Sequence, residues 1–117
     1  MKVLLVDDEE ELVTTLAERL SFRGVDALWT TTGCDAVALT RQEPFDVVVL
    51  DVKMPNLNGI QLKKELERIR PEMKYVFVTG HGSEEDFRIG SAEADHYLAK
   101  PLDIEALVAT LMEVVEK

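Results

Sequence analysis

Three short apolar runs constrain the fold of this chain more than any other feature, because they define its central strands. The runs cover residues 3–6, 47–50 and 75–78, are rich in β-branched or aromatic residues, and do not alternate with polar ones. Such runs suit strands that are covered on both faces, as in a parallel sheet. Weaker strand candidates lie at 25–29 and 95–98. The pattern therefore predicts a parallel sheet of five strands.

Helical patterns separate these strands. Apolar residues recur at helical spacing over 8–22, over 58–69 and after Asp103, which is a good N-cap. A short helix is expected at 34–40, and a weak one at 83–92, where few positions are apolar. Five β-α units with short, right-handed connections predict an α/β fold, a doubly wound five-stranded parallel sheet with strand order 2-1-3-4-5. Both Trp29 and Phe77 are expected in the core.

Composition excludes several classes of protein. The 117 residues have room for one domain, taken as residues 1–117. Asp and Glu number 23 against 13 Lys and Arg, and the net charge of −10 disfavours direct binding to nucleic acid or to an anionic membrane. The one cysteine, Cys34, is expected to be buried and excludes an intramolecular disulfide. No apolar stretch approaches the roughly 18 residues of a membrane-spanning helix, so a soluble, cytoplasmic protein is expected.

Polar residues follow the predicted strands where each strand ends. Asp7 and Asp8 follow the first strand, Asp51 the third, Thr79 the fourth and Lys100 the fifth. Ligands of open α/β sheets bind outside the carboxyl ends of the strands, near the reversal of strand order. Converging carboxylates need a cation, and Mg²⁺ prefers such oxygen ligands. Together with a lysine and a hydroxyl, the acids predict a magnesium-dependent phosphoryl-transfer site.

In these motifs the chain resembles a two-component response-regulator receiver domain over its whole length. The motifs, in order, are Asp7-Asp8, Asp51-Val52-Lys53-Met54-Pro55 with Gly59, Thr79-Gly80, and Tyr97-Leu98-Ala99-Lys100-Pro101. The resemblance implies the (βα)5 flavodoxin-like receiver fold. It also implies a signalling switch rather than a metabolic enzyme, in which Asp51 accepts a phosphoryl group from a phosphohistidine of a sensor histidine kinase or phosphotransfer protein.

The resemblance implies a metal-binding role for four residues. Asp8 and Asp51 would bind Mg²⁺ directly, together with the backbone carbonyl of Lys53, while Asp7 would hold the ion largely through water. Taken alone, the two acids after the first strand would equally suit the positive end of a helix.

The resemblance also implies how the switch works. Thr79 and Lys100 would bind the phosphoryl oxygens, and a cis Lys100–Pro101 peptide bond would aim the lysine at the site. Thr79 would then move toward the phosphate while Tyr97 rotates inward; a static, half-buried tyrosine is the alternative. The surface that changes would comprise the fourth helix, fifth strand and fifth helix. It would engage a partner protein or an output domain, or form a dimer on phosphorylation, and a stand-alone regulator fits the sequence as well.

Three residues depart from the common pattern or stand out near the site. Lys53 and His81 lie two residues after Asp51 and Thr79, and our hypothesis is that they tune water access and the lifetime of the phospho-aspartate. The alternative is that both side chains simply point to solvent. Glu93 stands where many relatives have glycine. Either the fourth helix ends earlier, or Glu93 takes the place of a left-handed cap at some strain.

Three other functions are alternatives to the phosphoacceptor. An aspartate-nucleophile, magnesium-dependent phosphatase needs a second aspartate two residues after the first, where this chain has Lys53. A flavodoxin-like flavin binder needs a loop rich in hydroxyls and glycine after the first strand, where this chain has acids. An adaptor pseudo-receiver that is never phosphorylated is the third, and nothing in the sequence favours it, since all the expected site residues are present.

Overall fold

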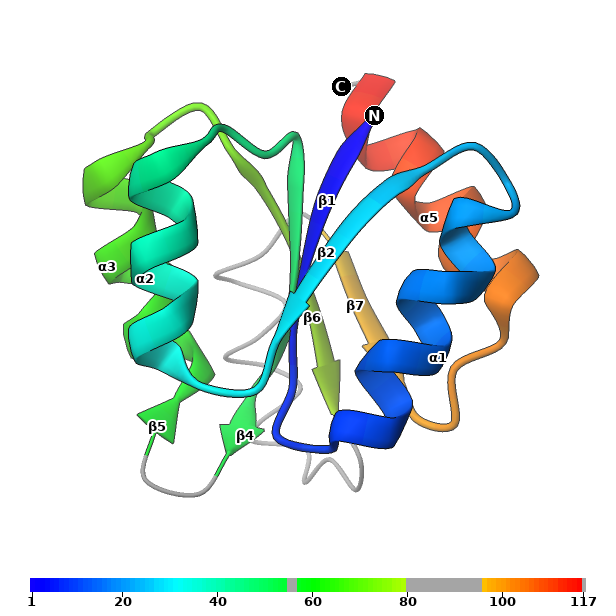
Figure 1. Cartoon of the computed structure of the whole chain (residues 1–117), viewed down its shortest axis with the longest axis horizontal. Coiled ribbons are helices and arrows are strands. Elements are labelled where there is room, and N and C mark those ends of the chain that lie inside the picture. Colours follow the sequence, from blue (N-terminus) through cyan, green and yellow to red (C-terminus); the bar gives the residue numbers. More distant parts are fainter. Residues whose placement is uncertain (55–56, 80–95, 117) are drawn as a thin grey trace.

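The sheet has the strand order that the sequence predicts. The computed structural model describes residues 1–54, 57–79 and 96–116. Its parallel strands are β1 (Lys2–Val6), β2 (Asp26–Thr30), β3 (Val47–Asp51), β6 (Lys74–Thr79) and β7 (His96–Ala99). They form one five-stranded sheet in the order β2-β1-β3-β6-β7 (Figure 1). Numbered along the sheet strands alone, this is 2-1-3-4-5, so the predicted doubly wound fold is confirmed.

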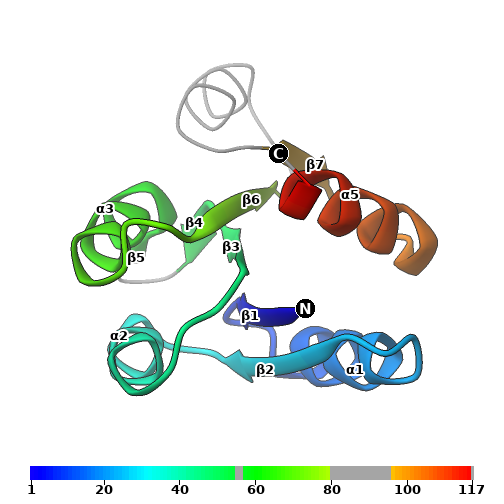
Figure 2. The same ribbon diagram turned by 90° about the horizontal axis from the view of Figure 1, so that it is seen from above.

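Helices cover both faces of this sheet. Within the described residues the helices are α1 (Glu10–Ser21), α2 (Gly33–Gln42), α3 (Gly59–Ile69) and α5 (Ile104–Glu116). Helices α1 and α5 lie on one face, and α2 and α3 lie on the other (Figure 2). Within the part of the chain that the structure describes, no helix is both long and apolar enough to cross a membrane. The helix expected at 83–92, and Glu93 after it, lie outside the described residues.

Local capping explains where three of these helices begin. The side-chain oxygen of Thr32 accepts a hydrogen bond from the backbone N–H of Asp35 at the start of α2 (3.2 Å). Asn58 accepts one from Ile60 at the start of α3 (2.8 Å). Asp103 accepts one from Ala106 at the start of α5 (3.2 Å), which confirms the predicted N-cap.

The sheet separates two apolar clusters. Alternate residues of each strand contribute to the cluster under α1 and α5 or to the cluster under α2 and α3, as the pleat requires. All five residues of β3 are buried, because β3 lies at the centre of the sheet. The end of this strand is therefore a fixed point, which matters because Asp51 is its last residue.

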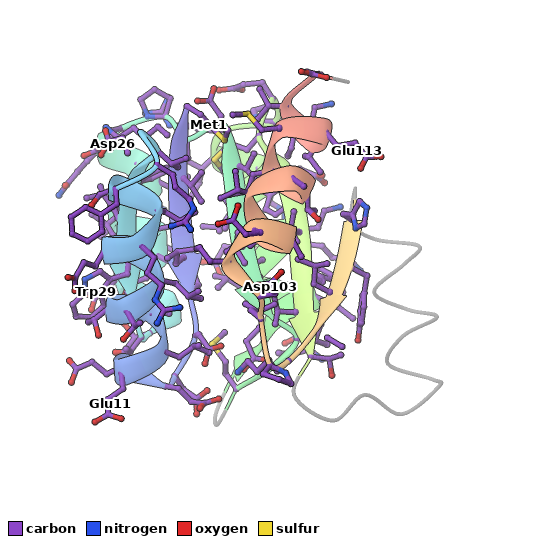
Figure 3. All side chains as sticks on the ribbon, turned by 90° about the vertical axis from the view of Figure 1, so that its right-hand side faces the viewer. Met1, Glu11, Asp26, Trp29, Asp103 and Glu113 are labelled. Atoms are coloured by element: carbon purple, nitrogen blue, oxygen red, sulfur yellow. The ribbon has the colours of Figure 1, made fainter. Side chains whose placement is uncertain are left out.

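Two short strands and two side chains differ from the sequence-based expectation. The antiparallel pair β4 (Lys53–Met54) and β5 (Leu57–Asn58) follows β3 and was not predicted. Phe77 is fully buried as expected, but Trp29 is 39% exposed because β2 is an edge strand (Figure 3). Cys34 is exposed rather than buried, because it lies on the first turn of α2.

Candidate functional site

Three carboxylates meet at the carboxyl ends of β1 and β3. Asp7 directly follows β1, and Asp51 ends β3, its neighbour in the sheet. Asp8 lies in the same loop as Asp7. One carboxylate oxygen from each of the three lies within 4.8 Å of the others. The structure thus brings together the acids that the sequence predicts to converge.

Burial makes this cluster electrostatically costly. Asp7 and Asp51 are each 5% exposed, whereas Asp8 is open to solvent. Burial raises the pKa of the Asp7 carboxyl, and the hydrogen-bonded Asp8 carboxyl raises it further. Its hydrogen bonds with Lys100 and with the backbone N–H of Glu9 lower the pKa but do not outweigh burial. The site therefore holds more negative charge than its own lysine compensates.

The same cluster fits a hard divalent cation. Its donors are all carboxylate oxygens, which are the ligands that Mg²⁺ and Ca²⁺ prefer, and their spacing suits a single ion. A cation there would also offset the cost of keeping Asp7 ionised in a buried position. The acidic cluster can therefore hold a metal ion.

Lys100 follows the edge strand β7, and its side chain reaches the carboxylates at the same end of the sheet. Its Nζ atom lies 2.7 Å from Asp7 Oδ2, 2.7 Å from Glu9 Oε1 and 3.4 Å from Asp51 Oδ2, and its side chain is 14% exposed. Burial alone would lower the pKa of this ammonium group, but the hydrogen bonds to Asp7 and Glu9 and the charges of Asp7 and Asp51 raise it above its usual value. Lys100 is therefore a charged group directed into the cluster. The Lys100–Pro101 peptide bond is cis, as the resemblance implied.

Thr79 and Tyr97 lie on the strands beside the cluster. Thr79 ends β6 one residue beyond Val78, the β-sheet partner of Asp51, and is buried. Its carbonyl oxygen accepts a hydrogen bond from the backbone N–H of Lys100 (2.7 Å). Tyr97 of β7 is half-buried and packs against the apolar cluster under α2 and α3. Both residues therefore occupy the strand positions that the sequence assigns to them.

Two further residues carry predictions that stay predictions. Lys53 lies in β4 opposite Asn58. Its side chain, and the whole of His81, lie outside the described parts of the chain. The tuning of the phospho-aspartate lifetime and the contact of the Lys53 carbonyl with a metal ion therefore stay predictions.

The site includes one residue to which the sequence assigned no role. Glu9 is the N-cap residue of α1, but its side chain makes no capping hydrogen bond and contacts Lys100 instead. Ser, Thr, Asp and Asn are the usual residues at such a position, because their short side chains reach the backbone N–H groups of the first turn. A glutamate at the N-cap position was therefore the one feature of the sequence that could have indicated another partner for this carboxylate.

This doubly wound sheet, with acids and a lysine gathered at its strand ends, defines a receiver-type α/β domain. A model of the family described as the response regulator receiver domain matches residues 3–112. The chain belongs to this family.

Two similar proteins of known sequence, one a transcriptional regulatory protein and one a response regulator, are longer than this chain. The transcriptional regulatory protein CpxR of Klebsiella pneumoniae is 38% identical over 117 residues, which are 99% of this chain and 50% of CpxR. The response regulator SaeR of Staphylococcus aureus is 28% identical over 116 residues, 98% of this chain and 50% of SaeR. The chain thus spans half the length of these two relatives.

Similar solved structures share the whole fold. A receiver domain protein (CheY-like) from Methanospirillum hungatei has a TM-score of 0.90 at 28% identity, with 98% of this chain and 93% of that chain covered. A response regulator from Burkholderia pseudomallei, solved with a phosphorylated aspartic acid, a calcium ion and citrate, has a TM-score of 0.87 at 28% identity. The match covers 98% of this chain and 68% of that one.

Proposed function

We propose that residues 1–117 act as one receiver domain in which Asp51 accepts a phosphoryl group in the presence of Mg²⁺. One observation carries the proposal: Asp51 shares an oxygen cluster within 4.8 Å with Asp7 and Asp8, while the Lys100 ammonium lies 3.4 Å from its carboxylate. A nucleophilic oxygen, a place for a metal ion and a fixed positive charge are the parts that phosphoryl transfer requires.

The transfer forms one bond and breaks another. A carboxylate oxygen of Asp51 attacks the phosphorus atom of a phosphohistidine, and a P–O bond forms as the P–N bond breaks. The imidazole nitrogen keeps the electron pair of the broken bond, and Asp51 becomes an acyl phosphate. Because little covalent chemistry is left to the protein, its task is to position the donor and to neutralise the charge of the transferred group.

Each neighbouring residue has a part in this proposal. Asp7, Asp8, Asp51 and the Lys53 carbonyl would hold the ion, which would neutralise charge on the phosphoryl oxygens. Lys100 would bind a phosphoryl oxygen from the opposite side, since its charge is already directed at Asp51. The proposed partner of the phosphoryl group on β6 is the Thr79 hydroxyl.

The proposed output is a change in the surface formed by the fourth helix, β7 and α5. Movement of Thr79 and rotation of Tyr97 would link the acceptor to this surface. On α5, Met112 and Val115 are 49% and 40% exposed, so both side chains would be available to a partner at this surface. The proposed partners are a sensor histidine kinase or phosphotransfer protein and, since the chain spans half of CpxR and SaeR, an output domain.

Labelling with acetyl phosphate tests the proposed acceptor. Wild-type protein in Mg²⁺ should gain one phosphoryl group, as measured by intact mass, and should gain none in EDTA. Asp51→Ala should remain unlabelled with an unchanged circular dichroism spectrum, while Asp35→Ala, an exposed aspartate on α2, should label as wild type does. Labelling of Asp51→Ala would refute the assignment. Rapid release of phosphate without accumulation of labelled protein would indicate the phosphatase, and an unlabelled wild type that releases no phosphate would indicate the adaptor.

A further inference from the structure

Glu9 contacts Lys100, the same lysine that would bind the phosphoryl group. The Glu9 Oε1 atom lies 2.7 Å from Lys100 Nζ, closer than Asp51 Oδ2, which lies at 3.4 Å. This contact links the loop after β1 to the loop after β7, which are 91 residues apart in the sequence. It is therefore a tertiary contact within the site rather than a local pairing of neighbours.

Both the backbone and the side chain of Glu9 belong to this network. Its backbone N–H donates a hydrogen bond to Asp7 Oδ1 (3.0 Å), while Asp7 Oδ2 forms an ion pair with Lys100 Nζ (2.7 Å). The hydrogen bond from the backbone fixes where the Glu9 side chain starts, and the side chain then extends to the ammonium group. Glu9 is thus placed by Asp7, which is itself one of the three acids of the cluster.

Three carboxylates surround the ammonium group of Lys100. It has three N–H donors, and Asp7, Glu9 and Asp51 each place an oxygen within 3.4 Å of its nitrogen. An arriving phosphoryl oxygen would compete with these carboxylates for the ammonium group. The Glu9 side chain is 60% exposed, against 7% for Asp7 and 6% for Asp51, so its carboxylate can return to water at the lowest cost.

We propose that Glu9 is a positioning residue that holds Lys100 before phosphorylation and thereby lowers the affinity of the site for anionic phosphodonors. The inference rests on the proposed function and adds how strongly the site binds its donor. Removing the Glu9 carboxylate frees one N–H group of Lys100 and removes a negative charge from the solvent-exposed side of the site. Both changes favour binding of the phosphodonor. The attack by Asp51 should change less, because Glu9 has no part in that step.

Three variants separate the contact from the charge. Glu9→Gln removes the charge and keeps the shape of the side chain. Glu9→Asp keeps the charge, but its shorter side chain suits the N-cap of α1 and withdraws from Lys100. Glu11→Gln removes the same charge two residues away, where the side chain projects from the outer side of α1 (Figure 3).

The measurement is the initial rate of Asp51 labelling against acetyl phosphate concentration, in saturating Mg²⁺ and low salt. For Glu9→Gln we expect the half-saturating concentration to fall about two- to fivefold, the range that an exposed ion pair supports, with a smaller change in the maximal rate. Glu9→Asp should shift in the same direction, Glu11→Gln should match wild type, and the shift should shrink in high salt.

Each outcome decides the matter. Wild-type kinetics in Glu9→Gln, or an equal shift in Glu11→Gln, would overturn the inference and leave the proposed function standing. Wild-type kinetics in Glu9→Asp would overturn the part assigned to the contact with Lys100. A wild-type protein that is not labelled at all would overturn the proposed function and this inference together.

Discussion

Gly59 packs directly against the backbone of Asp51. A Cβ atom at position 59 would overlap the carbonyl oxygen of Asp51 and lie 2.9 Å from the Cα atom of Val52. The backbone N–H of Gly59 also donates a hydrogen bond to the Val52 carbonyl (2.9 Å). The start of α3 is therefore in contact with the peptide that follows the proposed phosphoacceptor, and lack of space requires glycine there.

Gly59→Ala should damage the site as well as the fold. The added methyl group must displace the Asp51–Val52 peptide, which we expect to cost about 1–3 kcal/mol of unfolding free energy and to slow Asp51 labelling severalfold. Gly24→Ala is the matched control, because Gly24 has a φ of 79° and open space around it. It should lose roughly 1 kcal/mol through backbone strain yet label at the wild-type rate. Equal labelling rates in both variants would contradict the prediction.

Asp7→Asn should stabilise the metal-free protein near neutral pH. Burial raises the pKa of Asp7 above its ordinary 3.8, so in the pH range between the two values the folded state binds more protons than the unfolded state. The free energy of unfolding therefore falls as pH rises through that range. Asparagine resembles the protonated acid and avoids this loss. We expect a gain on the order of 1 kcal/mol in EDTA, measured by urea denaturation at neutral pH.

The pH dependence of that gain identifies its cause. The difference between Asp7→Asn and wild type should narrow as the pH falls through the raised pKa of the folded state and below 3.8, since the wild-type carboxyl then becomes protonated in both states. Asp35→Asn, which removes an exposed charge from α2, should show no such narrowing. A gain that is constant with pH would rule out the titration of Asp7 as its source.

Magnesium should stabilise the folded wild-type protein. An ion that binds only the folded state raises the free energy of unfolding by about 1.4 kcal/mol at roughly ten times its dissociation constant. Thermal denaturation with increasing MgCl₂ measures this effect. Asp51→Asn should lose most of it because one cluster oxygen loses its charge, whereas Asp35→Asn should keep all of it. If millimolar magnesium does not change the melting temperature of the wild-type protein, the proposed metal site is refuted.

Thr40→Val should stabilise the protein away from the site. Thr40 of α2 is fully buried, and within the described ranges its hydroxyl oxygen has no hydrogen-bond partner. Valine keeps the branched shape and removes the unpaired hydroxyl, so we expect a gain of about 1 kcal/mol in urea denaturation. Thr14→Val is the control, because the Thr14 hydroxyl donates to the Glu10 carbonyl (2.9 Å) and its loss should not stabilise. A loss of stability in Thr40→Val would mean that its hydroxyl has a partner after all.

The central strands could be predicted closely and the edge strands to within one residue, whereas the burial of Trp29 on the edge strand β2 could not. The apolar runs at 47–50 and 75–78 fall within β3 and β6, because these strands are covered on both faces and leave no polar alternation. Trp29 was wrongly assigned to the core, since β2 has a neighbour on one side only. The pair β4 and β5 was missed because strands of two residues are too short to show a period.

The site could be predicted as far as strand ends fix it. Asp51 ends a strand, and Asp7 and Lys100 each directly follow one, so the parallel sheet brings their backbones to one edge. The contact between Glu9 and Lys100 could not be predicted in this way, because it depends on the conformation of the Glu9 side chain rather than on a strand end. Helix patterns favour acids at the start of α1 in any case, which concealed the second role of Glu9.

The hydrogen bond from the Lys100 N–H to the Thr79 carbonyl joins the ends of β6 and β7 into one mechanical unit. Lys100 lies only a few residues before α5, which begins at Ile104. If Thr79 moves on phosphorylation as proposed, this hydrogen bond gives its movement a main-chain route to Lys100 and from there to α5.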